Sequence, residues 1–241
     1  FPHTPAPLKE HLGATRATVP KEQADFGIVV DPDVDRLAFV DEKGQMFGEE
    51  YTLVACADYV LSKTKGNTVS NLSSTRALRV ITEKHGGKYT AAAVGEVNVV
   101  VSMKAEKAVI GGEGNGGIIY PELHYGRDAL VGIALFLSHL ADRQQSVSVL
   151  KASYPSFFMS KNKVTLKVGM DVDGILEKIK NVYIDQNPST IDGVKIDFDD
   201  RWIHLRKSNT EPIIRIYTEA PSQAVADGLA ETVLNQINAL I

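Results

Sequence analysis

Six residues, Asp-Pro-Asp-Val-Asp-Arg at positions 31–36, constrain this chain more than any other segment. They follow the apolar run 26–30, which is typical of a buried strand, and three carboxylates then alternate where that strand should end. Like charges this close repel one another and raise each other's pKa values. A hard divalent cation bound through oxygen atoms removes that repulsion. The segment therefore predicts a metal site for phosphate chemistry, with Asp31, Asp33 and Asp35 as ligands.

Two other interpretations of the acidic segment stay open. An EF-hand calcium loop follows a helix and has glycine at its sixth position. Here a strand is expected before the loop and Arg36 takes the sixth position, although Glu42 falls at the twelfth. The second alternative is an acidic turn without a ligand. If the metal is present, Arg36 is the candidate catalytic residue, because a guanidinium there could hold a phosphate that bridges to the cation.

Composition narrows the class of protein. The 241 residues, 44% hydrophobic and 23% charged, are enough for one large domain or two ordinary domains. A net charge of -4 without a polybasic run argues against nucleic acid and membrane as partners. Cys56 is the only cysteine, and no apolar run approaches the roughly 18 residues of a membrane span, so a cytoplasmic location is expected. The start of the chain lacks Met and a signal-peptide pattern, and we expect a fragment.

The chain is expected to contain three parts. Residues 1–46 begin with a connector over residues 1–22 and end with the acidic segment between two strands. Helical and strand-like patterns alternate across residues 47–150, which predicts a doubly wound α/β/α domain. Successive strand-like runs with helices on one side predict a smaller α+β domain over residues 151–241, in which Pro221 begins the last helix.

The periodicity of apolar residues gives the expected elements. The expected strands cover residues 26–30, 37–40, 68–71, 108–110, 118–120, 163–168, 193–198, 201–205 and 213–219. The expected helices begin at 49 and 221 or cover 74–85, 98–104, 128–144 and 173–180. Arg127 and Asp128, just before one of these helices, are interpreted as helix-capping residues or as residues that face a cleft.

Two further loops carry polar groups of the kind that a sugar phosphate requires. Residues 111–117, Gly-Gly-Glu-Gly-Asn-Gly-Gly, offer only Glu113 and Asn115, whose carboxylate and amide suit sugar hydroxyls. A flexible hairpin turn is the alternative. Residues 206–215, Arg-Lys-Ser-Asn-Thr-Glu-Pro-Ile-Ile-Arg, combine guanidinium, hydroxyl and amide donors between two strands, as a phosphate dianion needs. A polar turn with solvated arginines is the alternative. The candidate phosphate ligands are Arg206, Ser208, Asn209, Thr210 and Arg215.

In their order and motifs, these three loops, together with the stretches 94–98 and 126–128, resemble the α-D-phosphohexomutase family. This family includes phosphoglucomutase, phosphomannomutase and phosphoglucosamine mutase. The resemblance covers nearly the whole chain and implies the end of domain 2 followed by domains 3 and 4 of a four-domain enzyme. It implies interconversion of hexose 1-phosphate and hexose 6-phosphate through a phosphoserine and a bisphosphate intermediate.

The resemblance also assigns roles to the residues of the three loops. Mg²⁺ would be held by the phosphoserine and by Asp31, Asp33 and Asp35. Glu113 and Asn115 match the loop that contacts the sugar ring. The non-reacting phosphate would be held by Arg206, Ser208, Asn209, Thr210 and Arg215.

Three departures from the family pattern matter. The Ser-His-Asn-Pro-like motif of the phosphoserine loop is absent, so we expect this chain alone to bind metal poorly, to be inactive and to need the missing N-terminal domains as partners. Gly117 stands where many relatives have histidine, and Val97 and Asn98 stand where many have Arg or Lys, so the hexose phosphate stays open. Two rival functions are a non-catalytic phosphosugar-binding module, which uses the second and third loops alone, and a calcium-stabilised structural domain.

Overall fold

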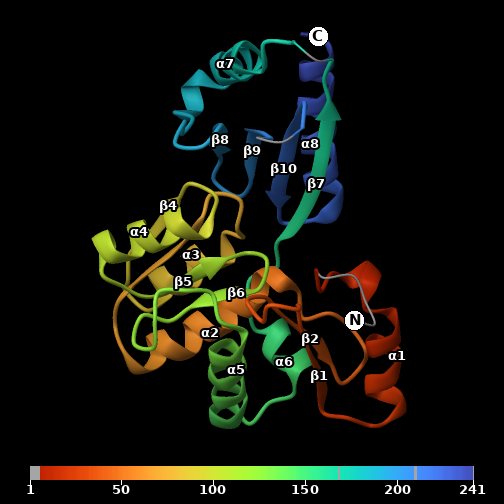
Figure 1. Cartoon of the computed structure of the whole chain (residues 1–241), viewed down its shortest axis with the longest axis vertical. Helices are drawn as coiled ribbons and strands as arrows, with labels where there is room; N and C mark the ends of the chain where they lie inside the picture. The colour runs from red at the N-terminus through yellow and green to blue at the C-terminus, as the bar shows by residue number, and fades with distance from the viewer. Residues whose placement is uncertain (1–5, 168, 209–210, 241) are drawn as a thin grey trace. The chain divides into compact units, whose positions relative to one another are not determined.

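The chain forms two compact units, which are described separately (Figure 1). The computed structural model describes residues 6–167, 169–208 and 211–240. The first unit comprises residues 1–155 and the second unit residues 156–241. Within the described part of the chain, no helix combines the length and the apolar character that a membrane span needs.

A β-hairpin at the start of the first unit frames the acidic segment. β1 (Phe26–Val30) and β2 (Leu37–Asp41) pair antiparallel, with Val30 opposite Leu37, so residues 31–36 form the connecting loop. The expectation of a simple connector over residues 1–22 was wrong, because η1 (Lys9–His11) and α1 (Gly13–Lys21) form there. The hairpin explains this, since one of its faces buries Leu12 together with Val29 and Ala38.

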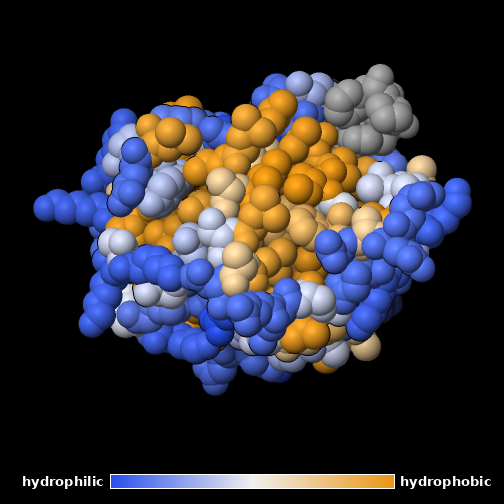
Figure 2. Space-filling view, turned by 90° about the horizontal axis from the view of Figure 1, so that it is seen from below, coloured by the Kyte–Doolittle hydropathy of each residue, from blue (hydrophilic) through white to orange (hydrophobic). Residues whose placement is uncertain are grey.

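The other face of the hairpin packs on α5 (Ala129–Arg143) through aromatic rings. Phe39 stacks on Phe136 with ring centroids 3.8 Å apart, and Phe47 meets Phe136 edge-on at 5.0 Å. Among the described residues, β1 pairs only with β2, so no strand pairs with its other edge. Figure 2 shows apolar side chains gathered on one face of the molecule. The aromatic contacts fix the position of the acidic loop relative to α5.

The α/β sheet of the first unit has the strand order β4-β3-β5-β6. Its first three strands are parallel and the last is antiparallel; the bounds are β3 (Asn67–Asn71), β4 (Tyr89–Ala92), β5 (Ala108–Glu113) and β6 (Gly117–Ile119). The helices of this unit are α2 (Glu49–Lys63), α3 (Ala77–Lys84), α4 (Glu96–Glu106), α5 and α6 (Val147–Ala152).

Helices cover both faces of this sheet. Val69 of β3 packs with Val99 of α4, whereas the neighbouring Thr68 meets Thr82 of α3, with the two hydroxyl oxygens 2.6 Å apart. Because successive side chains of a strand point to opposite faces, α4 and α3 lie on opposite sides. The doubly wound α/β architecture predicted from the sequence is therefore confirmed. The strand β4 and the helix α6 were not anticipated.

The second unit is the smaller α+β fold that the sequence predicted. Its antiparallel sheet has the order β7-β10-β9-β8, with bounds β7 (Phe158–Thr165), β8 (Val194–Asp197), β9 (Trp202–Lys207) and β10 (Ile213–Ala220). α7 (Val172–Val182) and α8 (Gln223–Asn238) share one apolar core with this sheet, and η2 (Ile184–Gln186) follows α7. The core holds Ile179, Ile203, Leu205, Ile216 and Val233.

Two boundaries in the second unit differ from expectation. β7 begins at Phe158 rather than at residue 163, since it pairs with β10 along the full length of that strand. Pro221 does not open the last helix. Ser222 is the N-cap of α8, and its side chain accepts a hydrogen bond from the amide of Val225 at 3.3 Å. The hydroxyl of Ser222 satisfies a free amide of the first turn, so Pro221 lies outside the helix.

Candidate active site

Three polar residues follow the three parallel strands of the first unit. Asn71 ends β3, Glu96 begins α4 shortly after β4, and Glu113 ends β5. The carboxyl ends of parallel strands meet at one edge of a sheet, which is where α/β proteins commonly bind ligands. Hydrogen bonds join Glu113 to the ends of the other two strands, because its Oε1 accepts from Nδ2 of Asn71 at 2.9 Å and from the amide of Gly95, next to Glu96, at 3.3 Å.

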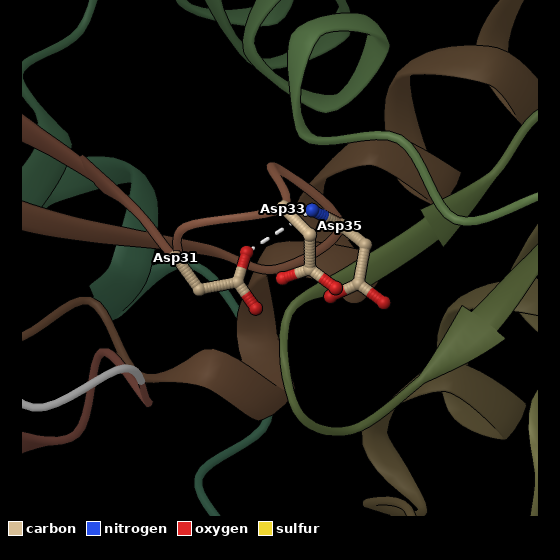
Figure 3. Close-up of side chains that lie close together, drawn as sticks. All are labelled: Asp31, Asp33 and Asp35. Carbon is tan, nitrogen blue, oxygen red and sulfur yellow. Dashed lines mark hydrogen bonds between the residues drawn. The ribbon is translucent and has the colours of Figure 1, made fainter.

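The acidic loop brings its three carboxylates together. Asp31, Asp33 and Asp35 can each present one oxygen within 4.8 Å of the others, and Figure 3 shows the three side chains side by side. Asp31 is buried and its Oδ1 accepts hydrogen bonds from the amides of Asp35 at 3.0 Å and Arg36 at 2.9 Å. Asp33 is exposed. The loop is therefore closed around Asp31, while Asp33 is open to solvent.

The loop geometry depends on a strained residue. Val34 has a φ of 58°, a value that β-branched residues rarely adopt. Its carbonyl accepts a hydrogen bond at 3.0 Å from the amide of Ala129, the first residue of α5. That bond connects the acidic loop to the start of a helix, and it holds the turn that brings Asp33 and Asp35 to the same side.

The electrostatics of the loop favour a divalent cation. Burial raises the pKa of Asp35, and the hydrogen bond and charge of Asp31 raise it further, against the lowering effect of Arg127. Oδ1 of Asp35 is buried and has no hydrogen-bond partner among the described residues. Nε of Arg36 lies 3.6 Å from both Asp31 and Asp35, too far for a hydrogen bond. Carboxylate oxygens with one buried atom left unpaired fit a hard cation such as Mg²⁺.

The glycine-rich loop is the tight turn between β5 and β6. Glu113 is buried, and Asn115 is half-buried with its Oδ1 accepting the amide of Gly117 at 3.1 Å. The amide of Gly114 donates to Oγ of Ser74 at 3.0 Å. Gly116, with a φ of 86°, accepts from the amide of Leu37 at 3.2 Å. These bonds hold the loop in one conformation beside the acidic loop.

Arg127 connects the two loops of the first unit. Its guanidinium donates to Oδ2 of Asp35 and to Oε2 of Glu113, the latter at 2.7 Å. The sequence interpretation of this residue as a helix cap was wrong, because Asp128 alone caps α5, accepting from the amides of Leu130 and Val131 at 2.7 and 3.1 Å. Arg127 faces the acidic cluster instead, and whether this side chain also faces a cleft stays a prediction.

The third loop lies in the second unit, between β9 and β10. Arg206 and Arg215 are directly opposite one another in these strands, and Arg215 is exposed. Nε of Arg206 donates to Oδ1 of Asp192 at 3.0 Å, and Oδ2 of the same carboxylate lies 2.9 Å from it as an ion pair. The amide of Ser208 donates to the carbonyl of Ile213 at 3.0 Å. Asn209 and Thr210, both predicted ligands, lie outside the described residues.

Sequence reasoning missed two residues that shape these loops. Glu96 accepts hydrogen bonds from Arg127, although the stretch 94–98 had been noted only as a family motif. Asp192 holds Arg206, and no local pattern distinguishes it from other surface aspartates. Both become important only through residues more than ten positions away in sequence.

Comparison with known proteins decides the family. Three models of phosphoglucomutase/phosphomannomutase match consecutive segments: the alpha/beta/alpha domain II over residues 1–44, the alpha/beta/alpha domain III over residues 48–157, and the C-terminal domain over residues 161–236. The chain belongs to the phosphoglucomutase/phosphomannomutase family. The resemblance noted in the three loops is thereby confirmed.

Curated relatives extend this finding. The chain is 35% identical over 234 residues to a phosphoglucomutase/phosphomannomutase of Thermococcus kodakarensis, covering 94% of this chain and 50% of the relative. It is 36% identical over 230 residues to a phosphoglucosamine/phosphogalactosamine mutase of Sulfurisphaera tokodaii, covering 93% and 50%. The chain thus spans about half the length of the curated relatives that it matches.

Solved structures share the fold. A phosphoglucomutase/phosphomannomutase family protein of Burkholderia thailandensis matches with a TM-score of 0.82 and 24% identity, covering 98% of this chain and 51% of that protein. The N-acetylphosphoglucosamine mutase of Aspergillus fumigatus, solved in complex with GlcNAc-6P and magnesium, matches with a TM-score of 0.64 and 16% identity, covering 92% and 56%. At these identities the likeness shows the fold alone.

Proposed function

We propose that this chain is part of a phosphohexomutase that interconverts hexose 1-phosphate and hexose 6-phosphate through a phosphoserine and a bisphosphate intermediate. One observation carries the proposal: Asp35, one of the three clustered aspartates, and Glu113 are held by the same guanidinium, that of Arg127. A cation site held beside a sugar-facing carboxylate is what a phosphoryl transfer to a sugar hydroxyl requires.

The metal end of the site would be formed by Asp31, Asp33 and Asp35, each through one oxygen. When bound, Mg²⁺ would neutralise the charge on the oxygens of the transferred phosphoryl group. Arg36 follows the last aspartate and is 37% exposed, so its guanidinium is available to hold a phosphate oxygen beside the cation. The alternative of an acidic turn without a ligand leaves the buried Oδ1 of Asp35 without a hydrogen-bond partner, with only Nε of Arg36 at 3.6 Å, and this favours the metal.

The sugar would be held by Glu113 and Asn115, which are the two side chains of the glycine-rich loop. The non-reacting phosphate would be held in the second unit by Ser208, Asn209 and Thr210 together with two arginines. Arg206 and Arg215 are cross-strand neighbours, and like charges placed directly opposite are destabilising unless an anion lies between them. Asp192 offsets part of this repulsion and fixes the guanidinium of Arg206 for a phosphate.

The domain assignment and the fragment status belong to the same proposal. Residues 1–46 would end domain 2, residues 47–150 would form domain 3, and residues 151–241 would form domain 4. The phosphoserine would come from N-terminal domains of the same protein, and this chain alone would be inactive. The cytoplasmic location also stays a prediction.

The test is a comparison of two proteins. The full gene product and the 241-residue chain are each assayed with glucose, mannose and glucosamine 1-phosphates and Mg²⁺. We expect the longer protein to convert at least one of them to the 6-phosphate, whereas the chain alone should bind a hexose bisphosphate without turnover. Binding without turnover by both proteins would instead support a phosphosugar-binding module. Preference for Ca²⁺ over Mg²⁺ would support a calcium-stabilised domain.

A further inference from the structure

One guanidinium group lies between the acidic loop and the glycine-rich loop. Arg127 is in the segment between β6 and α5, and its side chain is 14% exposed. Nη2 donates to Asp35, Nη1 donates to Glu113 at 2.7 Å, and Nε donates to Glu96 at 3.1 Å. Three nitrogens of one rigid planar group therefore hold three carboxylates from three separate segments.

The contact with Asp35 leaves one oxygen available. Arg127 engages Oδ2 of this carboxylate, while Oδ1 is buried and has no hydrogen-bond partner among the described residues. Ligating carboxylates are commonly oriented by a hydrogen bond to the oxygen that does not face the metal. Arg127 thus fixes the rotation of the Asp35 carboxylate, which presents one oxygen within 4.8 Å of oxygens of Asp31 and Asp33.

The contact with Glu113 fixes a second functional group. Arg127 donates a hydrogen bond to Oε2 of Glu113, and the side-chain amide of Asn71 and the backbone amide of Gly95 donate to Oε1. These three hydrogen bonds come from the end of β3, the residue before α4 and the segment before α5. Movement of Arg127 would therefore disturb the metal loop and the glycine-rich loop together.

This arrangement requires a residue without a side chain at position 117, which is Gly117. A Cβ atom placed there would lie 2.4 Å from Cδ of Arg127. The stem of the arginine thus occupies the space that a side chain at position 117 would fill. The identity of residue 117 and the position of Arg127 depend on one another.

The cluster as a whole keeps a net negative charge even with Arg127 in place, so it can still attract a cation. Five carboxylates face only two guanidinium groups, so three formal negative charges remain; the carboxylates are those of Asp31, Asp33, Asp35, Glu96 and Glu113, and the cations are Arg36 and Arg127. A divalent cation therefore reduces the net charge of the cluster instead of reversing it.

We propose that Arg127 is a positioning residue that couples the metal site to Glu113. The inference rests on the proposed function, because it takes Asp35 as a metal ligand and Glu113 as the sugar contact. Arg127 orients both carboxylates through one guanidinium, so that cation binding and sugar binding stabilise the same arrangement. If Arg127 only repelled the cation, its replacement would tighten cation binding instead of weakening it.

The first experiment measures the Mn²⁺ affinity of the full gene product by electron paramagnetic resonance titration, because the phosphoserine of the N-terminal domains is an expected ligand of the cation. Arg127→Met should weaken Mn²⁺ binding about tenfold or more, the usual effect of removing an outer hydrogen bond to a ligand. The matched control is Arg143→Met, which removes an arginine that holds the buried Asp58 at the far end of α5. The control should leave the affinity unchanged. Unchanged or tighter binding by Arg127→Met would overturn the inference.

A double-mutant cycle tests the coupling itself. Glu113→Gln should change Mn²⁺ affinity severalfold in the unsubstituted chain, although Glu113 is no metal ligand, and should change it little once Arg127 is replaced. Additive effects would overturn the inference. If Arg127→Met does not fold by circular dichroism, Arg127→Lys takes its place, because it keeps the charge and cannot hold three carboxylates.

The same titration separates this inference from the proposed function. Suppose that the unsubstituted protein binds Mn²⁺, that Asp33→Asn abolishes this binding and that Arg127→Met leaves it unchanged. This result would overturn only the role of Arg127. A complete lack of Mn²⁺ binding by the unsubstituted full gene product would overturn the metal centre of the proposed function as well.

Discussion

The amide of Leu37 donates a hydrogen bond to the carbonyl of Gly116 at 3.2 Å. This bond joins the first residue of β2, directly after the acidic loop, to the turn that carries Glu113. The two loops approach so closely there that a Cβ atom on Gly116 would lie 2.2 Å from the carbonyl oxygen of Leu37. The relative position of the cation site and the glycine-rich loop is thus set by backbone contact.

Gly116→Ala should destabilise the first unit and weaken its affinity for Mn²⁺. An alanine at position 116 would have to adopt a positive φ, and its Cβ would clash with the backbone of Leu37. We therefore expect a loss of about 2 kcal/mol or more in the free energy of unfolding. Urea denaturation followed by circular dichroism measures this loss. Gly86→Ala is the control, because Gly86 has a similar φ of 76° but open space around it. Equal losses for both variants would contradict the role of the Leu37 contact.

Asp31 and Asp33 should respond differently to alanine substitution. Asp33→Ala removes an exposed carboxylate, so it should abolish Mn²⁺ binding while leaving the free energy of unfolding nearly unchanged. Asp31→Ala also removes the acceptor of two backbone amides. It should therefore abolish Mn²⁺ binding and in addition lower the free energy of unfolding by about 1–2 kcal/mol. The two quantities come from Mn²⁺ titration and urea denaturation. Retained Mn²⁺ affinity in Asp33→Ala would disprove its assignment as a ligand.

Arg206→Ala or Arg215→Ala should weaken hexose bisphosphate binding by about 1–3 kcal/mol, the range for hydrogen bonds to charged groups. Isothermal titration calorimetry on the 241-residue chain measures this effect. Arg201→Ala serves as control, since Arg201 is paired with the neighbouring Asp200 and lies outside the loop. An effect of the control as large as that of Arg215→Ala would show that only net charge matters.

The second unit should lose stability as the pH falls from about 6.5 toward 4. Burial lowers the pKa of His204 to about 4, against the hydrogen bond to the carbonyl of Asp192, which raises it. The unfolded chain therefore takes up a proton below about pH 6.5 while the folded chain stays neutral, and folding loses on the order of 3 kcal/mol across this range. Below about pH 4 this loss levels off.

Trp202 provides the signal for that measurement, because it is the only tryptophan and is buried in the second unit. Urea denaturation followed by its fluorescence at several pH values should show a steeper pH dependence for the unsubstituted chain than for His204→Gln. The glutamine can still donate to the carbonyl of Asp192 but does not titrate. Identical slopes would exclude His204 as the source.

Much of the fold was accessible from local patterns. The strand before the acidic loop and the long helix α5 follow from apolar runs and periodicity, and the structure has them within a residue or two of the predicted bounds. β4 escaped detection because its four residues are only partly apolar and three of them are half-buried. α1 was overlooked because its single buried residue, Val19, gives no periodic signal. Short or weakly amphipathic segments obtain their structure from the surfaces against which they pack.

The fold class and the chemical groups of each loop can be predicted from the sequence alone, since these depend on residue types at neighbouring positions. Which of these groups meet follows from the three-dimensional fold. Arg127 contacts Asp35 across 92 positions and Glu113 across 14, and Arg206 contacts Asp192 across 14. Such pairs depend on strand order and on the return of the chain between elements. Side chains distant in sequence are brought within hydrogen-bond distance by the burial of apolar surface, which the polar residues themselves do not encode.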